Sequence, residues 1–165
     1  DLMNSINARG TFMVSKFAIP YLTKAANPHI LMLSPPLDMQ TKWFAPATAY
    51  AMAKFGMSLV VLGLAGELRG KVAVNALWPR TIIATDALNM IPGIEIARCR
   101  KPDIVADAAH AILVRSAHGF SSNFLIDEAV LRATGVRAFA PYAVDPANEL
   151  PTDLVLVLRQ ATIGE

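Results

Sequence analysis

Cysteine is nearly absent from this sequence of 165 residues, which contains Cys99 alone. A single cysteine excludes an internal disulfide and any metal site built from several cysteines. No signal-peptide pattern opens the sequence, so nothing in it indicates export to an oxidising compartment. We therefore expect a cytoplasmic protein.

Charged residues are also scarce, at 17% of the sequence against about 25% in ordinary globular domains. Hydrophobic residues make up 54%, which excludes intrinsic disorder because disorder needs low hydrophobicity and high net charge. The formal net charge is only +2, and no basic stripe interleaves with aromatic residues. We therefore expect no nucleic-acid partner.

Long apolar runs without charge are missing as well. The longest in the most apolar region is 55–66, twelve residues between Lys54 and Glu67. A bilayer span needs roughly 20 such residues, so this run suits a buried helix and predicts no membrane span. The surrounding segment, about 47–68, is apolar on nearly every face, and we expect both of its sides to be buried.

The apolar segments that are present predict alternating helices and strands. The segment 80–100 has no clean period and is expected to be a loop with short helical pieces. This order is typical of a parallel α/β sheet covered by helices on both faces. The expected helices are 2–26, 47–68, 102–113 and 128–134, and the expected strands are 29–33, 72–77 and 124–127, with a further late strand or partner-binding segment at 154–158.

Tyr50 and Lys54 are the residues that most suggest chemistry. At positions i and i+4 they share one face of a helix, and an ammonium in an apolar helix is costly unless something polar meets it. A nearby ammonium would lower the pKa of the phenol, which would make Tyr50 a usable proton donor and acceptor near neutral pH. The alternative is a surface lysine whose stem lies beside a core tyrosine.

Four stretches of the sequence share a pattern with one family: Ile6-Asn7-Ala8-Arg9-Gly10-Thr11-Phe12, Ile30-Leu31-Met32-Leu33-Ser34, Tyr50-Ala51-Met52-Ala53-Lys54 and Val74-Asn75-Ala76-Leu77-Trp78-Pro79. In residues and order they resemble the short-chain dehydrogenase/reductase family. The resemblance covers roughly 1–128, and 34–37, 77–81 and 123–128 look most like its hydroxysteroid-dehydrogenase-like branch. It implies a doubly wound, Rossmann-type fold and hydride transfer with NAD or NADP.

The resemblance also implies roles for single residues. Tyr50 matches the acid/base of the family, and Lys54 matches the residue that lowers the tyrosine pKa and binds the nicotinamide ribose. Asn7 matches the helix asparagine that anchors a water in the proton relay, although a solvent-facing polar residue is the alternative. The loop that lies against the nicotinamide matches Pro79, Thr81 and Ile82.

Two positions depart from the family pattern. The usual pair of serines is Ser34-Pro35 here, so Ser34 is either a relocated donor to the substrate oxygen or simply the end of a strand. The usual Pro-Gly is Pro79-Arg80. Arg80 lacks the backbone freedom of glycine, and its side chain either meets a phosphate or substrate carboxylate or lies in solvent.

The pair Asp127-Glu128 could bind a ligand or simply begin a helix.

The glycine-rich phosphate loop of the family is absent, because no group of glycines follows a strand in this sequence. We therefore expect 1–140 to be the C-terminal portion of a Rossmann-type domain and 141–165 to be a proline-rich tail. Alone, such a piece should aggregate and show no dinucleotide affinity.

The sequence thus predicts an oxidoreductase that acts on a small carbonyl or alcohol substrate, with Tyr50 as acid/base. The apolar helices around 13–22 and 58–68 also predict a homodimer or homotetramer. The alternative is a non-catalytic α/β module, derived from the same fold, that serves dimerisation or lipid binding.

Overall fold

The computed structural model describes residues 1–45, 47–91 and 93–148. The chain divides into two compact units. The first contains Asp1–Trp78 and Ile112–Leu125, and the second contains Pro79–Ala111 and the described residues from 126 onward. Each unit has a hydrophobic cluster of its own.

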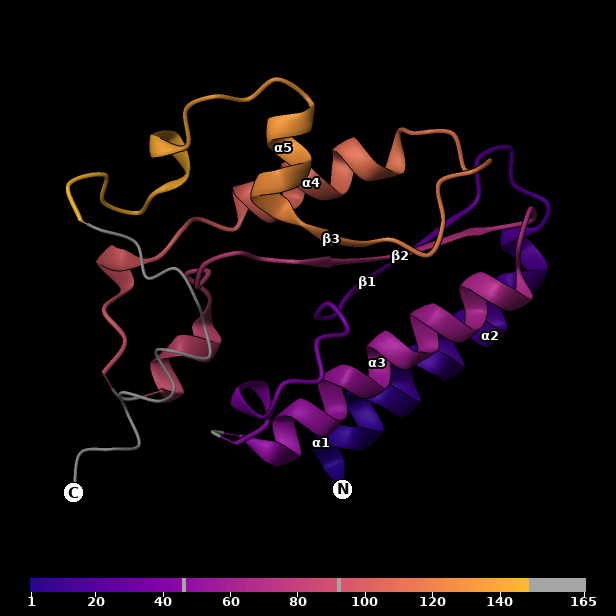
Figure 1. Ribbon diagram of the computed structural model, residues 1–165, viewed down its shortest axis with the longest axis horizontal. Helices are drawn as coiled ribbons and strands as arrows, with labels where there is room; N and C mark the ends of the chain where they lie inside the picture. The colour runs from indigo at the N-terminus through magenta and orange to yellow at the C-terminus, as the bar shows by residue number, and fades with distance from the viewer. Residues whose placement is uncertain (46, 92, 149–165) are drawn as a thin grey trace. The chain divides into compact units, whose positions relative to one another are not determined.

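Helices at the start of the chain pack along a long helix of the same unit. The first helical stretch consists of α1 (Leu2–Asn4), a π-helical turn (Ser5–Arg9) and α2 (Gly10–Leu22). It runs beside α3 (Thr48–Glu67), as Figure 1 shows. The approach is closest at Gly56, where a Cβ atom would lie only 2.7 Å from the Cβ of Ala8. Glycine is therefore required there by packing.

Within the described part of the chain, the sheet has three strands in the order β1-β2-β3. They are β1 (His29–Leu33), β2 (Ala73–Trp78) and β3 (Phe124–Ile126). The first two pair in parallel, with His29 opposite Ala73 and Leu33 opposite Leu77. The central strand β2 is buried from Ala73 to Leu77, as expected for an apolar strand covered on both faces. The predicted α/β fold is confirmed.

Only one face of α3 enters the core. Val61, Leu64 and Ala65 pack with Val74 and Ala76 of β2. The prediction that both sides of this helix are buried is wrong for the single chain. Away from the sheet, α3 contacts the first helical stretch at Gly56, but Met52 (64%), Leu59 (61%) and Leu62 (48%) stay exposed.

By length and composition, α3 is also long and apolar enough to cross a membrane, as core helices of soluble proteins can be. Seven of its residues are buried in the chain itself, which is how a helix packed on a sheet behaves.

The second unit contains the irregular segment predicted for 80–100, with short 3-10 helices at Asp86–Met90 and Ile96–Arg98. Ile82, Leu88 and Cys99 form its apolar cluster. The unit also contains α5 (Asp127–Ala133) and a 3-10 turn at Ala140–Tyr142. Cys99 is fully buried, so its thiol serves packing.

Helix α4 (Asp103–Leu113) buries one row of its apolar side chains. Ile104, Ala108 and Ile112 are buried, whereas Leu113 is 42% exposed. The first helix of the chain ends at Leu22, before the predicted end near residue 26. The segment 154–158 lies outside the described residues, and the domain boundary at 140/141 stays a prediction.

Candidate active site

Helix α3 places Tyr50 and Lys54 one turn apart near its N-terminal end, and both side chains are half-buried. The ammonium nitrogen of Lys54 lies 3.9 Å from the Met57 sulfur, which is a weak acceptor. It also lies 5.8 Å from the centre of the Trp78 ring, at the end of β2. Among the described residues, neither Tyr50 nor Lys54 has an oxygen or nitrogen partner for its polar head.

Burial shifts both pKa values toward the uncharged forms. It raises the pKa of the Tyr50 phenol and lowers the pKa of the Lys54 ammonium, since a charged form loses hydration in a half-buried site. The predicted lowering of the tyrosine pKa is thus wrong for the chain without ligands. The desolvation of Tyr50 dominates, and the ammonium contacts Met57 and Trp78 instead.

Ser34 directly follows β1 and is fully buried. Its Oγ atom has no hydrogen-bond partner among the described residues. The next residue, Pro35, accepts a hydrogen bond of 2.6 Å from the Ser58 hydroxyl of α3, which holds this turn against the helix. In this conformation Ser34 is enclosed, so it would have to become accessible before it could meet a substrate oxygen.

Asn7 lies within the π-helical turn Ser5–Arg9 and is half-buried. Its side-chain amide donates a 2.9 Å hydrogen bond to the Met3 carbonyl. The sequence predicted an ordinary helix here, and apolar spacing does not distinguish the two. Single π turns inside helices are frequent at functional sites. The neighbouring contact between Ala8 and Gly56 fixes this turn against α3.

The predicted nicotinamide loop lies in the second unit. Pro79 is half-buried, and Ile82 is buried in the cluster with Leu88 and Cys99. Thr81 is 4% exposed, and its Oγ1 atom finds no hydrogen-bond partner among the described residues. The structure therefore brings Tyr50 and Lys54 together in one unit and Thr81 and Ile82 together in the other.

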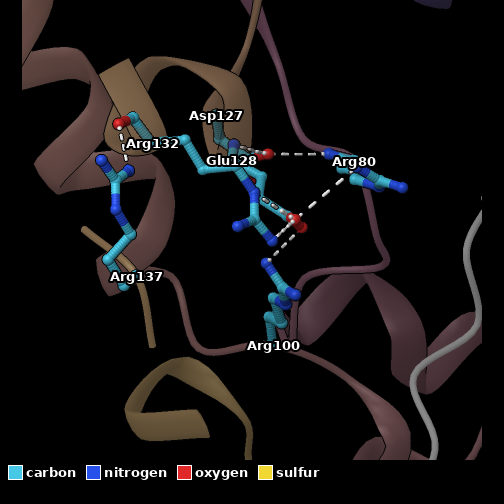
Figure 2. Close-up of polar contacts among 6 residues, drawn as sticks. All are labelled: Arg80, Arg100, Asp127, Glu128, Arg132 and Arg137. Atoms are coloured by element: carbon cyan, nitrogen blue, oxygen red, sulfur yellow. Dashed lines mark hydrogen bonds and ion pairs between the residues drawn. The ribbon is translucent and has the colours of Figure 1, made fainter. Parts of the chain in front are cut away.

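For the acidic pair Asp127-Glu128, the sequence left open whether it binds a ligand or begins a helix. Both residues are buried at the start of α5. The Oδ1 atom of Asp127 accepts hydrogen bonds from the backbone N–H groups of Arg80 (2.9 Å) and Glu128 (2.6 Å). Figure 2 shows these contacts. The hypothesis that the pair only begins a helix is therefore incomplete, because Asp127 also binds the loop after β2.

The Glu128 carboxylate forms ion pairs with three arginines from different parts of the sequence. Its carboxylate lies 3.1 Å from Arg100, 2.7 Å from Arg132 and 3.6 Å from Arg80 (Figure 2). Burial would raise its pKa, but the hydrogen bonds of Arg132 and the charges of Arg100 and Arg80 lower it overall. The Arg80 side chain is 54% exposed, so it lies partly in solvent, as one alternative from the sequence had it, and it also makes the ion pair with Glu128. The residue types alone gave no signal for this cluster.

Each unit, taken by itself, holds a donor of the kind that a nicotinamide cofactor could satisfy. In the first unit it is the half-buried ammonium of Lys54, which has only weak contacts. In the second unit it is the buried hydroxyl of Thr81, which has no partner among the described residues. No group of three or more metal-ligating side chains was found among the described residues. The functional roles of Tyr50, Lys54, Asn7, Ser34, Pro79, Thr81 and Ile82 stay predictions.

Known proteins support this interpretation. No family model matches the chain, but it is 51% identical over 157 residues to hydroxysteroid dehydrogenase-like protein 2 of Danio rerio. In structure it resembles a protein of Xanthomonas campestris assigned as a dehydrogenase, with a TM-score of 0.90 and 54% identity. It also resembles a short-chain dehydrogenase of Mycobacterium thermoresistibile, with a TM-score of 0.85 and 46% identity. These matches confirm the short-chain dehydrogenase/reductase family.

The matched region is one part of a longer fold. The alignment covers 94% of this chain but 38% of the Danio rerio protein. The two crystal structures are covered to 57% and 55%, against 93% of this chain. The chain therefore fits the C-terminal half of a short-chain dehydrogenase/reductase, as the sequence predicted.

Proposed function

We propose that this protein is an NAD- or NADP-dependent oxidoreductase that interconverts a small carbonyl compound and its alcohol. The observation that carries the proposal is the pair Tyr50 and Lys54, whose polar heads lack strong partners among the described residues. The matched relatives are named a hydroxysteroid dehydrogenase-like protein and a short-chain dehydrogenase, and these names support the same reaction class. When bound, the nicotinamide cofactor supplies or accepts the hydride.

Tyr50 is the proposed proton donor for carbonyl reduction. Because burial raises its pKa, the phenol keeps its proton at neutral pH in the chain without ligands. It can therefore donate that proton to a carbonyl oxygen that gains charge. Alcohol oxidation needs the reverse transfer, which the Lys54 ammonium favours if it moves toward the phenol from its place beside Met57 and Trp78.

In this proposal the remaining predicted residues hold the cofactor and a water molecule and orient the substrate. Lys54 binds the nicotinamide ribose, and the Asn7 amide anchors a water of the proton relay. The loop of Pro79, Thr81 and Ile82 lies against the nicotinamide. The buried Ser34 hydroxyl would orient the substrate oxygen only after the turn at Pro35 shifts.

Substitution of Tyr50 by phenylalanine tests the proposal in the full-length protein. NADH and NADPH fluorescence titrations measure cofactor binding, and a panel of aliphatic, cyclic and steroid ketones measures turnover. Tyr50→Phe should lower turnover by roughly 100- to 10,000-fold while the cofactor Kd stays the same, since only the proton donor is removed. The matched control is Tyr21→Phe, at an exposed tyrosine of α2.

Two results would count against this function. If Tyr50→Phe keeps more than about a tenth of the wild-type turnover, Tyr50 is not the acid/base, because general acid catalysis contributes at least roughly 100-fold. If the full-length protein binds neither NADH nor NADPH, the oxidoreductase proposal fails as a whole. The non-catalytic module would then be the better description.

A separate observation favours self-association. The first helical stretch and α3 expose large apolar side chains: Leu2, Ile6, Phe12, Val14, Phe17, Tyr21, Met52, Leu59 and Leu62. An exposed apolar patch on neighbouring helices is typical of a protein interface. We propose that these helices pair in a homodimer or homotetramer, and sedimentation of the full-length protein as a stable monomer at micromolar concentration would contradict this. We also propose that the protein is cytoplasmic.

A further inference from the structure

The loop after β2 is tied to the rest of its unit at two points. At its start, the backbone N–H of Arg80 donates a 2.9 Å hydrogen bond to Asp127. Further along, the N–H of Arg100 donates to the Ile82 carbonyl, and the N–H of Ala84 donates to the Arg100 carbonyl, at 2.9 and 2.8 Å. Residues 80–84 are therefore held at both ends.

The second tie depends on Glu128 through the side chain of Arg100. The two side chains are nearly fully buried, and the Arg100 guanidinium lies 3.1 Å from the Glu128 carboxylate. Arg132 donates two hydrogen bonds to the other oxygen of the same carboxylate. Removal of this carboxylate would leave Arg100 as a buried charge without its partner, which is strongly unfavourable.

The first tie depends on a single oxygen atom of Asp127. Its Oδ1 accepts the N–H groups of both Arg80 and Glu128, so it joins the loop to the first turn of α5. The carboxyl group is fully buried, so its removal leaves the N–H groups of Arg80 and Glu128 without this acceptor. An unsatisfied buried N–H group costs free energy, so the loop would move to satisfy it.

Thr81 and Ile82 lie between the two ties. Ile82 is packed into the apolar cluster, and the Thr81 hydroxyl is buried without a partner among the described residues. A buried hydroxyl without a partner costs free energy, so a constraint from elsewhere in the unit must hold this segment in place. The ties at Arg80 and Arg100 supply that constraint.

We propose that Asp127 and Glu128 are positioning residues, which fix the backbone of the loop 80–84 for contact with the cofactor. The side chains of Thr81 and Ile82 are buried in the chain itself, so they pack within the unit rather than offer a surface. The proposal rests on the proposed function, because it assigns this loop to NAD(P) binding. It also accounts for Arg80 in place of glycine. The backbone N–H of Arg80 and its side chain bind one acidic pair, so the loop needs constraint here rather than conformational freedom.

The test compares Asp127→Ala and Glu128→Gln with the wild type in the full-length protein. Amide hydrogen exchange of residues 80–84 reports on the loop without cofactor, and NADH or NADPH titration reports on binding. Asp127→Ala should accelerate amide exchange at 80–84 by about tenfold or more, because it removes a charge-assisted hydrogen bond. It should also raise the cofactor Kd by about tenfold or more. At saturating cofactor, kcat should change little, which separates positioning from chemistry.

Two further variants control for general damage. Asp145→Ala removes an aspartate that also accepts a backbone N–H in the same unit, from Ala147, and it should leave exchange at 80–84 unchanged. Asp127→Asn keeps an oxygen acceptor for Arg80 and should restore most of the cofactor affinity. If Asp127→Ala does not fold, Glu128→Gln and Asp127→Asn carry the comparison, with a larger loss in the former.

The outcomes separate the two proposals. If the wild type binds cofactor and Asp127→Ala binds it equally well, the positioning role is wrong and the proposed function stands. If the wild type binds neither NADH nor NADPH, the proposed function fails and the positioning role fails with it. Faster exchange at 80–84 with unchanged affinity would reduce the acidic pair to a purely structural tie, which overturns the proposal.

Discussion

The surroundings of Glu128 and those of Tyr50 and Lys54 differ in how far the protein itself satisfies its polar groups. Glu128 meets three arginines within 3.6 Å. Lys54 meets only a sulfur atom and an aromatic ring. Buried polar groups in native proteins are nearly always paired. Both carboxylate oxygens of Glu128 are paired, although Arg100 and Asp127 keep buried polar atoms without a hydrogen-bond partner among the described residues. Glu128 should therefore act through the stability of its unit and the conformation of its loop, and Lys54 should act through direct contact with a ligand.

The largest expected effect on stability comes from Glu128→Ala. The substitution leaves Arg100 buried without its partner and should lower the free energy of unfolding by about 3–5 kcal/mol. Urea denaturation measures the change. Glu95→Ala, at an exposed position of the same unit, should have almost no effect. A loss for Glu128→Ala similar to that of Glu95→Ala would remove the contrast between the two regions.

Lys54→Met should show the opposite pattern. It should weaken cofactor binding and lower turnover by about tenfold or more, since the removed ammonium is proposed to bind the ribose. Stability should not fall. Burial lowers the pKa of Lys54, so its charged form costs stability below that pKa, and the variant should gain relative to the wild type at neutral pH and less in strong alkali.

The control for Lys54 is Lys42→Met. Lys42 also lies over an aromatic ring, at 4.5 Å from the centre of Trp43, but it is exposed. This variant should leave cofactor binding, turnover and stability unchanged. Equal cofactor Kd values for the Lys54 and Lys42 variants would make Lys54 a surface lysine, which is the alternative that the sequence left open.

Gly56→Ala should destabilise the first unit by about 1–3 kcal/mol, because the added methyl group would overlap the side chain of Ala8. Gly63→Ala in the same helix is the matched control. Nothing lies within 4 Å of its added Cβ, so this variant should be neutral or more stable by up to about 1 kcal/mol through helix propensity. Thermal unfolding measures both, and a stabilised Gly56→Ala would contradict the close packing of the two helices.

The smallest change in stability is expected for Asp127→Asn, and its size depends on pH. Burial raises the pKa of Asp127, only partly offset by its hydrogen bonds with Arg80 and Glu128. A raised carboxyl pKa contributes stability below the ordinary value of 3.8, and this contribution is lost as the pH rises through the folded-state value. The asparagine variant should therefore gain stability relative to the wild type from acid to neutral pH. An opposite slope in unfolding experiments would show that the ionised form is the stabilised one.

The sequence was most informative where local rules decide. The strand His29–Leu33 was predicted with its observed bounds, because prolines and a compact apolar run mark both ends. The helix Thr48–Glu67 was also predicted, but its burial was not, since an all-apolar pattern does not say which face finds a partner. The π turn around Asn7 was not predicted, because apolar spacing in the sequence does not distinguish α-helical from π-helical turns.

The sequence by itself determined the order of helices and strands, the α/β fold and the placement of Tyr50 and Lys54 on one helix. Those features follow from periodicity, turn residues and a spacing of four, which are local properties of the chain. Only the tertiary structure decided that Ser34 is enclosed, that the ammonium of Lys54 lies over Trp78 and that Asp127 binds Arg80. The last contact joins residues 47 positions apart, and its partners are set by how the segments pack, a property that no short stretch of sequence contains.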